Sequence, residues 1–128
     1  MLGLFLARYG FRPDIIISSP KARALETATI VAGHLGVPVR TVPGLAGPLD
    51  AGDLEAMLAT TGDPARPVLV GHDPALSELA AELVGLDELP LRKGALVRLD
   101  LDRPLVPGTG LIRWLIPPDL LDPGDAAE

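Results

Sequence analysis

One stretch decides the fold, Pro13-Asp14-Ile15-Ile16-Ile17-Ser18-Ser19-Pro20-Lys21-Ala22-Arg23. Its β-branched run over residues 14–18 is too short for a helix and is typical of a buried parallel strand. Pro20 is placed to open a long helix, because the N–H that proline lacks is unused in a first helical turn. Gly36 follows as the residue that closes this helix. A strand that passes directly into a helix predicts an α/β fold.

The segments on either side extend this alternation. A helical spacing over residues 1–9 ends at Gly10, and nothing caps its front. We expect a strand over 37–42, a helix over 50–61, a strand over 67–70 and a helix from Asp73 and Pro74 to Gly85. Two extended stretches follow at 95–102 and 111–116, joined by a Pro/Gly-rich loop over 103–110. The order predicts a mostly parallel sheet with a late antiparallel strand pair.

Composition fits one small domain with an aliphatic core. The chain has 128 residues, of which 48% are hydrophobic and only 3% aromatic. This length matches the usual size of a single domain. We expect residues 1–118 to form that domain and residues 119–128 to form an acidic tail.

Charge and cysteine content exclude several classes of function. The net charge of −6 argues against a nucleic-acid partner and against an anionic membrane surface. No cysteine is present, so disulfides, thiolate metal sites and a cysteine nucleophile are excluded. We expect no cofactor and no metal, because Asp50, Asp53 and Glu55 fit the acidic start of a helix. The absence of a long apolar run and of a signal-peptide pattern predicts a cytoplasmic protein.

Two strand-to-helix junctions carry side chains suited to binding an anion. Ligands of open α/β sheets bind at the carboxyl ends of strands. Arg23 lies in the first turn of one helix, and His72 lies at a strand end just before another. Each has a structural alternative, since Arg23 can be solvated, His72 can bond a carbonyl, and Ser19 can cap its helix. Together they favour a phosphate site, with Ser19 and the backbone N–H of Asp73 as further contacts.

Two sequence blocks resemble the histidine phosphatase superfamily. Residues 13–28 look like its Ser-Ser-Pro…Arg…Glu-Thr-Ala block, and residues 70–74 look like its later Gly-His block. Lys93-Gly94-Ala95 resembles the phosphohistidine phosphatase branch, the SixA-like proteins. The resemblance implies a three-layer α/β/α, phosphoglycerate mutase-like fold. It also implies that Arg23 binds the phosphoryl group, and that His72 bonds a non-bridging oxygen and stabilises the transition-state charge.

The resemblance also implies a nucleophilic histidine that has no match in this sequence. In the family this histidine belongs to an Arg-His-Gly motif at the end of the first strand, takes the phosphoryl group and passes it to water. Only His34 remains beside His72. It lies eleven residues beyond Arg23 on one predicted helix, roughly 16 Å away, so it cannot serve. Arg8-Tyr9-Gly10 is rejected because only eight positions separate Gly10 from Ser18, too few for the loop and helix of the family.

A chain that begins within a helix explains both the missing motif and the uncapped front. On this hypothesis Met1 is an internal methionine or the first residue of a fragment, and an upstream reading frame encodes the first strand. A chain starting at Met1 should then be poorly stable, or should exchange a strand between subunits as a homodimer.

Three functions remain open. The first is a phosphatase acting on a phosphorylated protein carrying phosphohistidine, or on a small phosphomonoester. The second is a more general phosphatase or mutase of the same superfamily. The third is a phosphate-binding module that keeps Arg23 and His72 without turnover.

Overall fold

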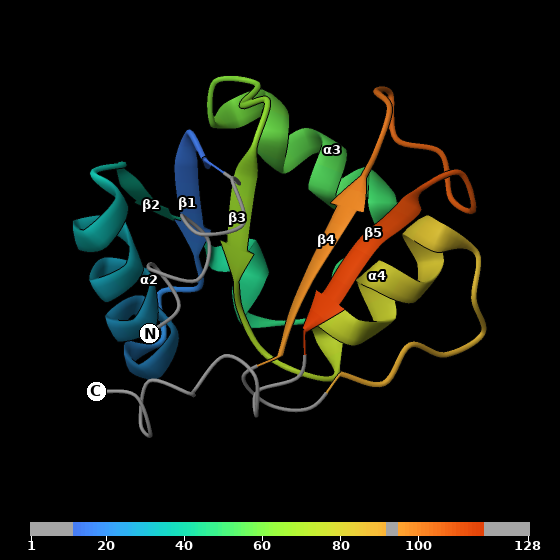
Figure 1. Cartoon of the computed structure of the whole chain (residues 1–128), viewed down its shortest axis with the longest axis horizontal. Helices are drawn as coiled ribbons and strands as arrows, with labels where there is room; N and C mark the ends of the chain where they lie inside the picture. Colours follow the sequence, from blue (N-terminus) through green and yellow to red (C-terminus); the bar gives the residue numbers. More distant parts are fainter. Residues whose placement is uncertain (1–11, 92–94, 117–128) are drawn as a thin grey trace.

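The computed structural model describes residues 12–91 and 95–116, and it is drawn in Figure 1. The elements in chain order are β1 (Ile15–Ser18), α2 (Ala22–Leu35), β2 (Val39–Thr41), the 3-10 helix η1 (Pro43–Ala46), α3 (Ala51–Thr60), β3 (Pro67–Val70), α4 (Ala75–Val84), β4 (Leu96–Asp100) and β5 (Leu111–Ile116). The expected helix over 1–9, the Lys93-Gly94 pair and the tail over 119–128 lie outside the described residues.

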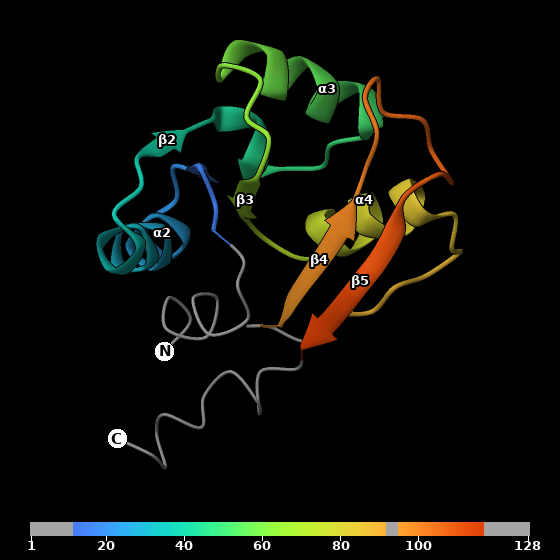
Figure 2. The same cartoon turned by 45° about the horizontal axis from the view of Figure 1, so that its top comes forward.

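Strand β1 lies at the centre of a parallel three-stranded sheet of order β2-β1-β3. Its side chains alternate between two cores, as the pleat of a strand requires. Ile16 packs with Ala28 and Val31 of α2. Ile15 and Ile17 pack on the other face, in the core that contains leucines of α3 and α4. Helices therefore cover both faces, and α2 lies on the opposite side of β3 from α4 (Figure 2). The predicted three-layer α/β class is confirmed.

Strands β4 and β5 form a separate antiparallel sheet, which confirms the predicted late strand pair. A register irregularity falls between Arg98 and Leu99. Asp100 accepts ion pairs from Arg98 and Arg113 at 3.6 and 3.4 Å. The β4–β5 sheet is much less buried than β1: Leu111 is 64% exposed and Ile112 is 39% exposed.

The first helix of the decisive stretch begins two residues later than predicted. Lys21 is the N-cap of α2, so Pro20 precedes the helix. The hydroxyl oxygen of Ser19 accepts the Lys21 N–H at 3.1 Å, which stabilises a local turn before the helix starts. The other end agrees with prediction, since Gly36 closes α2 at a φ of 69°.

The prediction of Asp73 as N-cap and Pro74 as first helical residue is wrong by one position. Pro74 is the N-cap and α4 starts at Ala75. The Asp73 carboxylate still accepts the backbone N–H of Ser77 at 3.1 Å and its hydroxyl at 2.7 Å. The acidic side chain therefore stabilises the start of the helix from just outside it.

Helix α3 matches its predicted range closely. Asp50 is the N-cap, and its side chain and that of Asp53 form a reciprocal capping box, with distances of 2.8 and 3.0 Å. The expected inward residues, Leu54, Met57 and Leu58, are all buried. Glu55, in the same helix, does not take part in this capping box. Its carboxylate binds the β4–β5 loop and accepts the backbone N–H of Leu105 at 2.8 Å.

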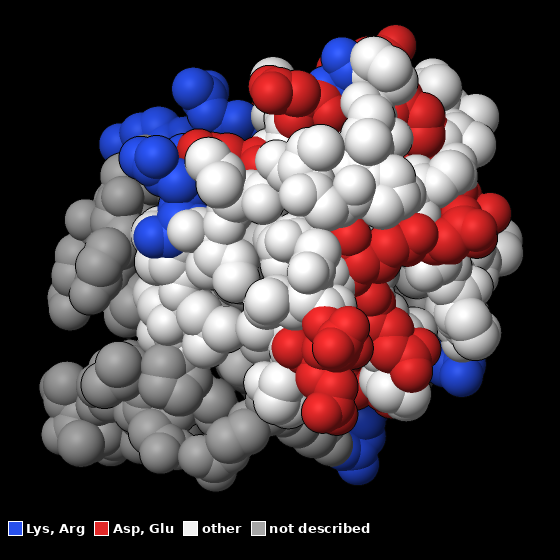
Figure 3. Space-filling model, turned by 90° about the vertical axis from the view of Figure 1, so that its right-hand side faces the viewer, with Lys and Arg blue, Asp and Glu red and all other residues white. Residues whose placement is uncertain are grey.

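Acidic side chains gather in patches on the face of the molecule shown in Figure 3, and lysines and arginines lie mostly at its margins. Asp73, Glu78, Asp87 and Glu88 line a shallow hollow of about 330 Å³ beside α4. Such a face repels polyanions. No helix within 12–91 or 95–116 has both the length and the apolar composition needed to cross a bilayer.

Candidate functional site

The carboxyl ends of β1 and β3 bring two of the predicted residues into contact. The two strands are parallel neighbours, with Ser18 opposite Val70. The Ser19 N–H donates to the Val70 carbonyl at 2.9 Å, which extends the ladder past the last paired residues. As a result, Nε2 of His72 lies 2.8 Å from the Ser19 hydroxyl oxygen. Serine and histidine thus meet where ligands of parallel sheets bind.

The Ser19 hydroxyl contacts Nε2 of His72 and so holds one edge of the ring. Because its oxygen already accepts the Lys21 N–H, its hydroxyl hydrogen is available to donate to Nε2. In the tautomer in which Ser19 donates to Nε2, the ring proton is on Nδ1, which can then donate to an anion. The neighbouring hydroxyl, of Ser18, donates instead to the Ser19 carbonyl at 2.8 Å. Both serines are fully buried.

The loop that holds His72 is fixed by close packing. The His72 carbonyl accepts the Leu76 N–H at 3.0 Å. A Cβ at Gly71 would lie 3.3 Å from the carbonyl oxygen of Leu45 in η1 and 3.3 Å from Cδ1 of Leu76. Glycine therefore allows η1 and α4 to approach the strand end, while His72 itself keeps partial exposure to solvent.

Arg23 lies on the same junction as Ser19, four residues further along the chain. It is the second residue of α2, and its side chain is exposed. Within the described part of the chain no carboxylate pairs with it. Unpaired N–H groups of the first turn of α2 add a partial positive charge beside it. These features suit an arginine that binds an incoming anion.

Asp73 and His34 are placed less favourably for binding phosphate. The Asp73 carboxylate is engaged with Ser77 and borders the acidic hollow, so only its backbone could face an anion. His34 is exposed in the last turn of α2, at the opposite end from Arg23, as expected. Among the residues that the structure describes, no cluster of three or more His, Cys, Asp or Glu side chains could hold a metal ion.

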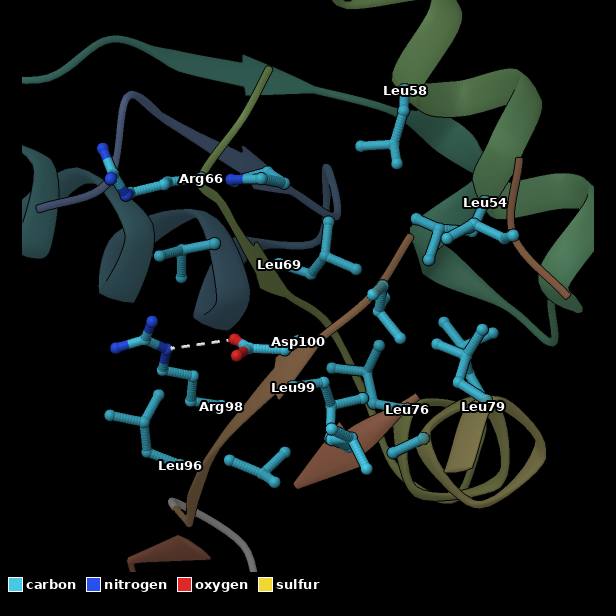
Figure 4. Close-up of a pocket in the computed structure, with 18 of the residues that line it drawn as sticks. Leu54, Leu58, Arg66, Leu69, Leu76, Leu79, Leu96, Arg98, Leu99 and Asp100 are labelled. Carbon is cyan, nitrogen blue, oxygen red and sulfur yellow. Dashed lines mark ion pairs between the residues drawn. The ribbon is translucent and has the colours of Figure 1, made fainter. Parts of the chain in front are cut away.

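A large cavity lies away from these residues, between β3 and β4. It has a volume of about 670 Å³, and leucines of both strands and of α3 and α4 line it (Figure 4). Sequence analysis missed this cavity. The one available signal was the continuous apolar run over 67–70, which predicts a strand with neighbours on both sides.

A second feature absent from the sequence analysis joins α3 to the β4–β5 loop. Arg103 donates from Nε to Glu55 at 2.9 Å, makes a further bond to it through its terminal nitrogen, and pairs with Asp63 at 3.0 Å. The hydrogen bonds from Arg103 and from the Leu105 backbone lower the pKa of Glu55, and Glu55 raises the pKa of Arg103 in turn.

Comparison with known proteins gives the family and agrees with the fold. The sequence profile of the histidine phosphatase superfamily (branch 1) matches residues 2–67. A structure of the protein histidine phosphatase SixA complexed with tungstate is similar, with a TM-score of 0.78 and 26% identity, over 94% of this chain and 78% of that one. A putative phosphohistidine phosphatase SixA from Agrobacterium tumefaciens matches with a TM-score of 0.68 and 20% identity, over 91% and 75% of the two chains. No curated protein sequence matches the chain.

Proposed function

Because the chain belongs to the histidine phosphatase superfamily, we propose that its substrate is phosphohistidine on a protein and that its phosphoryl site is the Ser19–His72–Arg23 junction. The superfamily is one of phosphatases, and the structural similarity to SixA supports the choice of substrate. The observation that carries the assignment of the site is the 2.8 Å contact between Ser19 and His72 at the carboxyl ends of β1 and β3. A basic side chain and a helix N-terminus adjoin it.

Each residue has a distinct task at the phosphoryl group. Arg23 donates two parallel hydrogen bonds to phosphoryl oxygens and neutralises part of their charge. His72 donates from Nδ1 to a non-bridging oxygen, where charge accumulates in the transition state. Ser19 was predicted as a phosphate contact; because it is fully buried and bonds His72, we assign it instead the role of positioning the His72 ring. The backbone N–H of Asp73 supplies a further donor.

Phosphate binding without turnover is the second candidate, and one observation favours it. Phosphoryl transfer through a histidine needs a nucleophile besides His72, and the 128 residues contain only one other histidine. That residue, His34, is in the last turn of α2, away from the strand ends. Arg23 and His72 would then bind a phosphorylated ligand that this stretch of chain does not hydrolyse.

A combined binding and turnover experiment separates the two candidates. Tungstate binding is measured by calorimetry, and release of phosphate is measured from a phosphohistidine peptide, a phosphoserine peptide and p-nitrophenyl phosphate. A phosphatase releases phosphate fastest from phosphohistidine, and His72→Ala abolishes both release and binding. Tight binding without release supports the binding module. His34→Ala is the matched control and should retain the properties of the unmodified chain. If His72→Ala binds tungstate normally, the assignment of the site is wrong.

A further inference from the structure

Strands β1 and β3 lie side by side, and polar contacts hold them together at both ends (Figure 1). Just before β1, the Asp14 carboxylate accepts the Ala65 N–H at 2.8 Å and, through both oxygens, the Arg66 N–H at 3.2 Å. The Asp14 N–H donates to the Arg66 carbonyl at 3.1 Å. Just after β1, the Ser19 N–H donates to the Val70 carbonyl at 2.9 Å. We call the bonds of Asp14 to Ala65 and Arg66 the Asp14 clamp.

The apolar side chains of the two strands discriminate only weakly among possible alignments. Where one face of a strand is polar, a slip of one residue is costly, because it moves the apolar side chains to the wrong face. Residues 15–17 of β1 and 68–70 of β3, however, are apolar at every position, and β1 is buried throughout. Sliding one strand along the other by one or two residues keeps apolar side chains on both faces. The observed pairing of Ile15 with Pro67 therefore needs a further determinant.

The Asp14 clamp supplies contacts that exist in one alignment only. A hydrogen bond from an N–H to an oxygen spans about 2.7–3.2 Å, and a slip of one residue moves a strand by about 3.3 Å. Such a slip takes the Asp14 carboxylate away from the Ala65 N–H. The bonds to the carboxylate are also charge-assisted, which makes each one stronger than a bond between neutral groups. The clamp therefore favours the observed register over its neighbours.

The same register determines the geometry of the phosphoryl site. Ser19 follows β1 and His72 follows β3, so the separation of their side chains changes directly when one strand slides along the other. Their contact is 2.8 Å long, and a slip of about 3.3 Å breaks it. Asp14 itself lies five residues before Ser19, roughly 16 Å away along an extended strand. It is therefore too far from the site to touch a bound anion.

We propose that Asp14 is a positioning residue of the phosphoryl site, which places Ser19 against His72 by selecting the register of β1 with β3. The proposal rests on the proposed function for the identity of that site, and it adds a residue from the opposite end of the sheet. Asp14 acts through the geometry of its acceptor oxygens. A substitution that keeps an acceptor in place should therefore preserve the site.

Three substitutions test the Asp14 clamp. Asp14→Ala removes both acceptor oxygens and should weaken tungstate binding by about three- to tenfold. Asp14→Asn should weaken it by less than about twofold, because one oxygen of Asp14 already accepts both N–H groups and the amide oxygen can replace it. Asp50→Ala is the matched control. Asp50 is also an exposed aspartate that accepts a backbone N–H, that of Asp53 at 2.8 Å, but it caps α3, and its loss should leave binding unchanged.

Two readouts separate positioning from a general loss of stability, and neither requires an anion. The ring nitrogen shifts of His72 should change in Asp14→Ala, in the same direction as in Ser19→Ala, and should stay the same in Asp50→Ala. Hydrogen exchange of the Ser19 amide should accelerate in Asp14→Ala by about tenfold, because this amide reports opening of β1 from β3. The Gly36 amide, bonded to the Ala32 carbonyl at 2.8 Å, is the reference and should keep its rate.

Equal acceleration of the Ser19 and Gly36 amides would overturn the proposal, because it would indicate general destabilisation. Unchanged ring shifts of His72 in Asp14→Ala would also overturn it. If Asp14→Ala does not fold, Asp14→Glu makes the same comparison, since it keeps the charge but displaces the carboxylate, and it should alter the ring shifts and the Ser19 amide alone. A chain that binds no tungstate, but whose ring shifts follow the Asp14 clamp, would refute the anion site and support the positioning role.

Discussion

The two sheets of this protein differ in how completely their strands are surrounded. Strand β1 has a partner on each edge and a helical layer on each face, and Ile16 and Ile17 are fully buried. In the β4–β5 pair, by contrast, β4 is half-buried and much of β5 is exposed. At the carboxyl end of β1 the Ser19 N–H is bonded to the Val70 carbonyl of β3, and this pairing places the buried Ser19 hydroxyl against His72. The difference teaches that the candidate site depends on the first sheet, since Ser19, His72 and Arg23 all lie at the ends of its strands or on the helix that follows β1.

The largest expected effect is on stability, and it contrasts the two sheets directly. Ile16→Ala removes side-chain atoms from a fully buried position and should lower the free energy of unfolding by about 2–5 kcal/mol. Ile112→Ala in β5, where the side chain is 39% exposed, should cost less than about 1 kcal/mol. Urea unfolding of both variants measures the difference. Equal losses would show that the second sheet is as well packed as the first.

The next effect concerns anion binding at the first sheet. Arg23→Ala removes charged hydrogen bonds to the phosphoryl group and should weaken tungstate binding by about 10- to 100-fold. Arg113→Ala on β5 is the control, because it removes the same charge from the second sheet. Calorimetric titration measures both affinities. Similar losses in the two variants would reduce the role of Arg23 to long-range electrostatics.

A smaller effect separates the two adjacent buried serines. Ser19→Ala removes the hydrogen bond to His72 and should weaken tungstate binding by about three- to tenfold. Ser18→Ala removes a buried hydroxyl that bonds only the Ser19 carbonyl, and binding should persist. Nitrogen chemical shifts of the His72 ring give an independent readout, since Ser19→Ala removes the contact with Nε2 and should change them, whereas Ser18→Ala should not. Ring shifts that are unchanged in Ser19→Ala would contradict the positioning role.

The smallest effect is the pH dependence of the α3 contact with the β4–β5 loop. Arg103 lowers the pKa of Glu55 below its ordinary value of 4.5 in the folded chain. The stability from this contact is therefore present above pH 4.5 and is lost as the pH falls through the folded-state pKa. Glu55→Gln should flatten the stability profile in this acidic range, measured by urea unfolding at each pH. Glu26→Gln on the exposed surface of α2 should leave the profile unchanged.

Local sequence signals predicted the first sheet and most of its helices. The isoleucine run of β1, the Gly36 terminus of α2 and the inward leucines of α3 each depend on neighbours within a few residues. Helix starts were less predictable. Ser19 bonds the Lys21 N–H before α2 begins, and the Asp73 carboxylate reaches Ser77 from outside α4.

Relations between distant segments were only partly predictable. The carboxyl ends of parallel strands lie at the same edge of a sheet, and this indicated that the Ser19 and His72 junctions share an edge. Their 2.8 Å contact, however, depends on the register of β1 with β3. The cavity between β3 and β4 could not be derived at all, because it depends on how two strands far apart in the sequence are placed relative to one another. The approach of Arg23 to a shared anion remains a prediction.

Titration of the two histidines with phosphate tests the central claim most directly. The chain has only His34 and His72, so each provides a reference for the other in one NMR sample. An anion site at the first sheet predicts a saturable shift of the His72 ring signals, an unchanged His34 and loss of the His72 shift in Arg23→Ala. Parallel shifts of both rings, or a His72 signal that does not respond to phosphate, would contradict it.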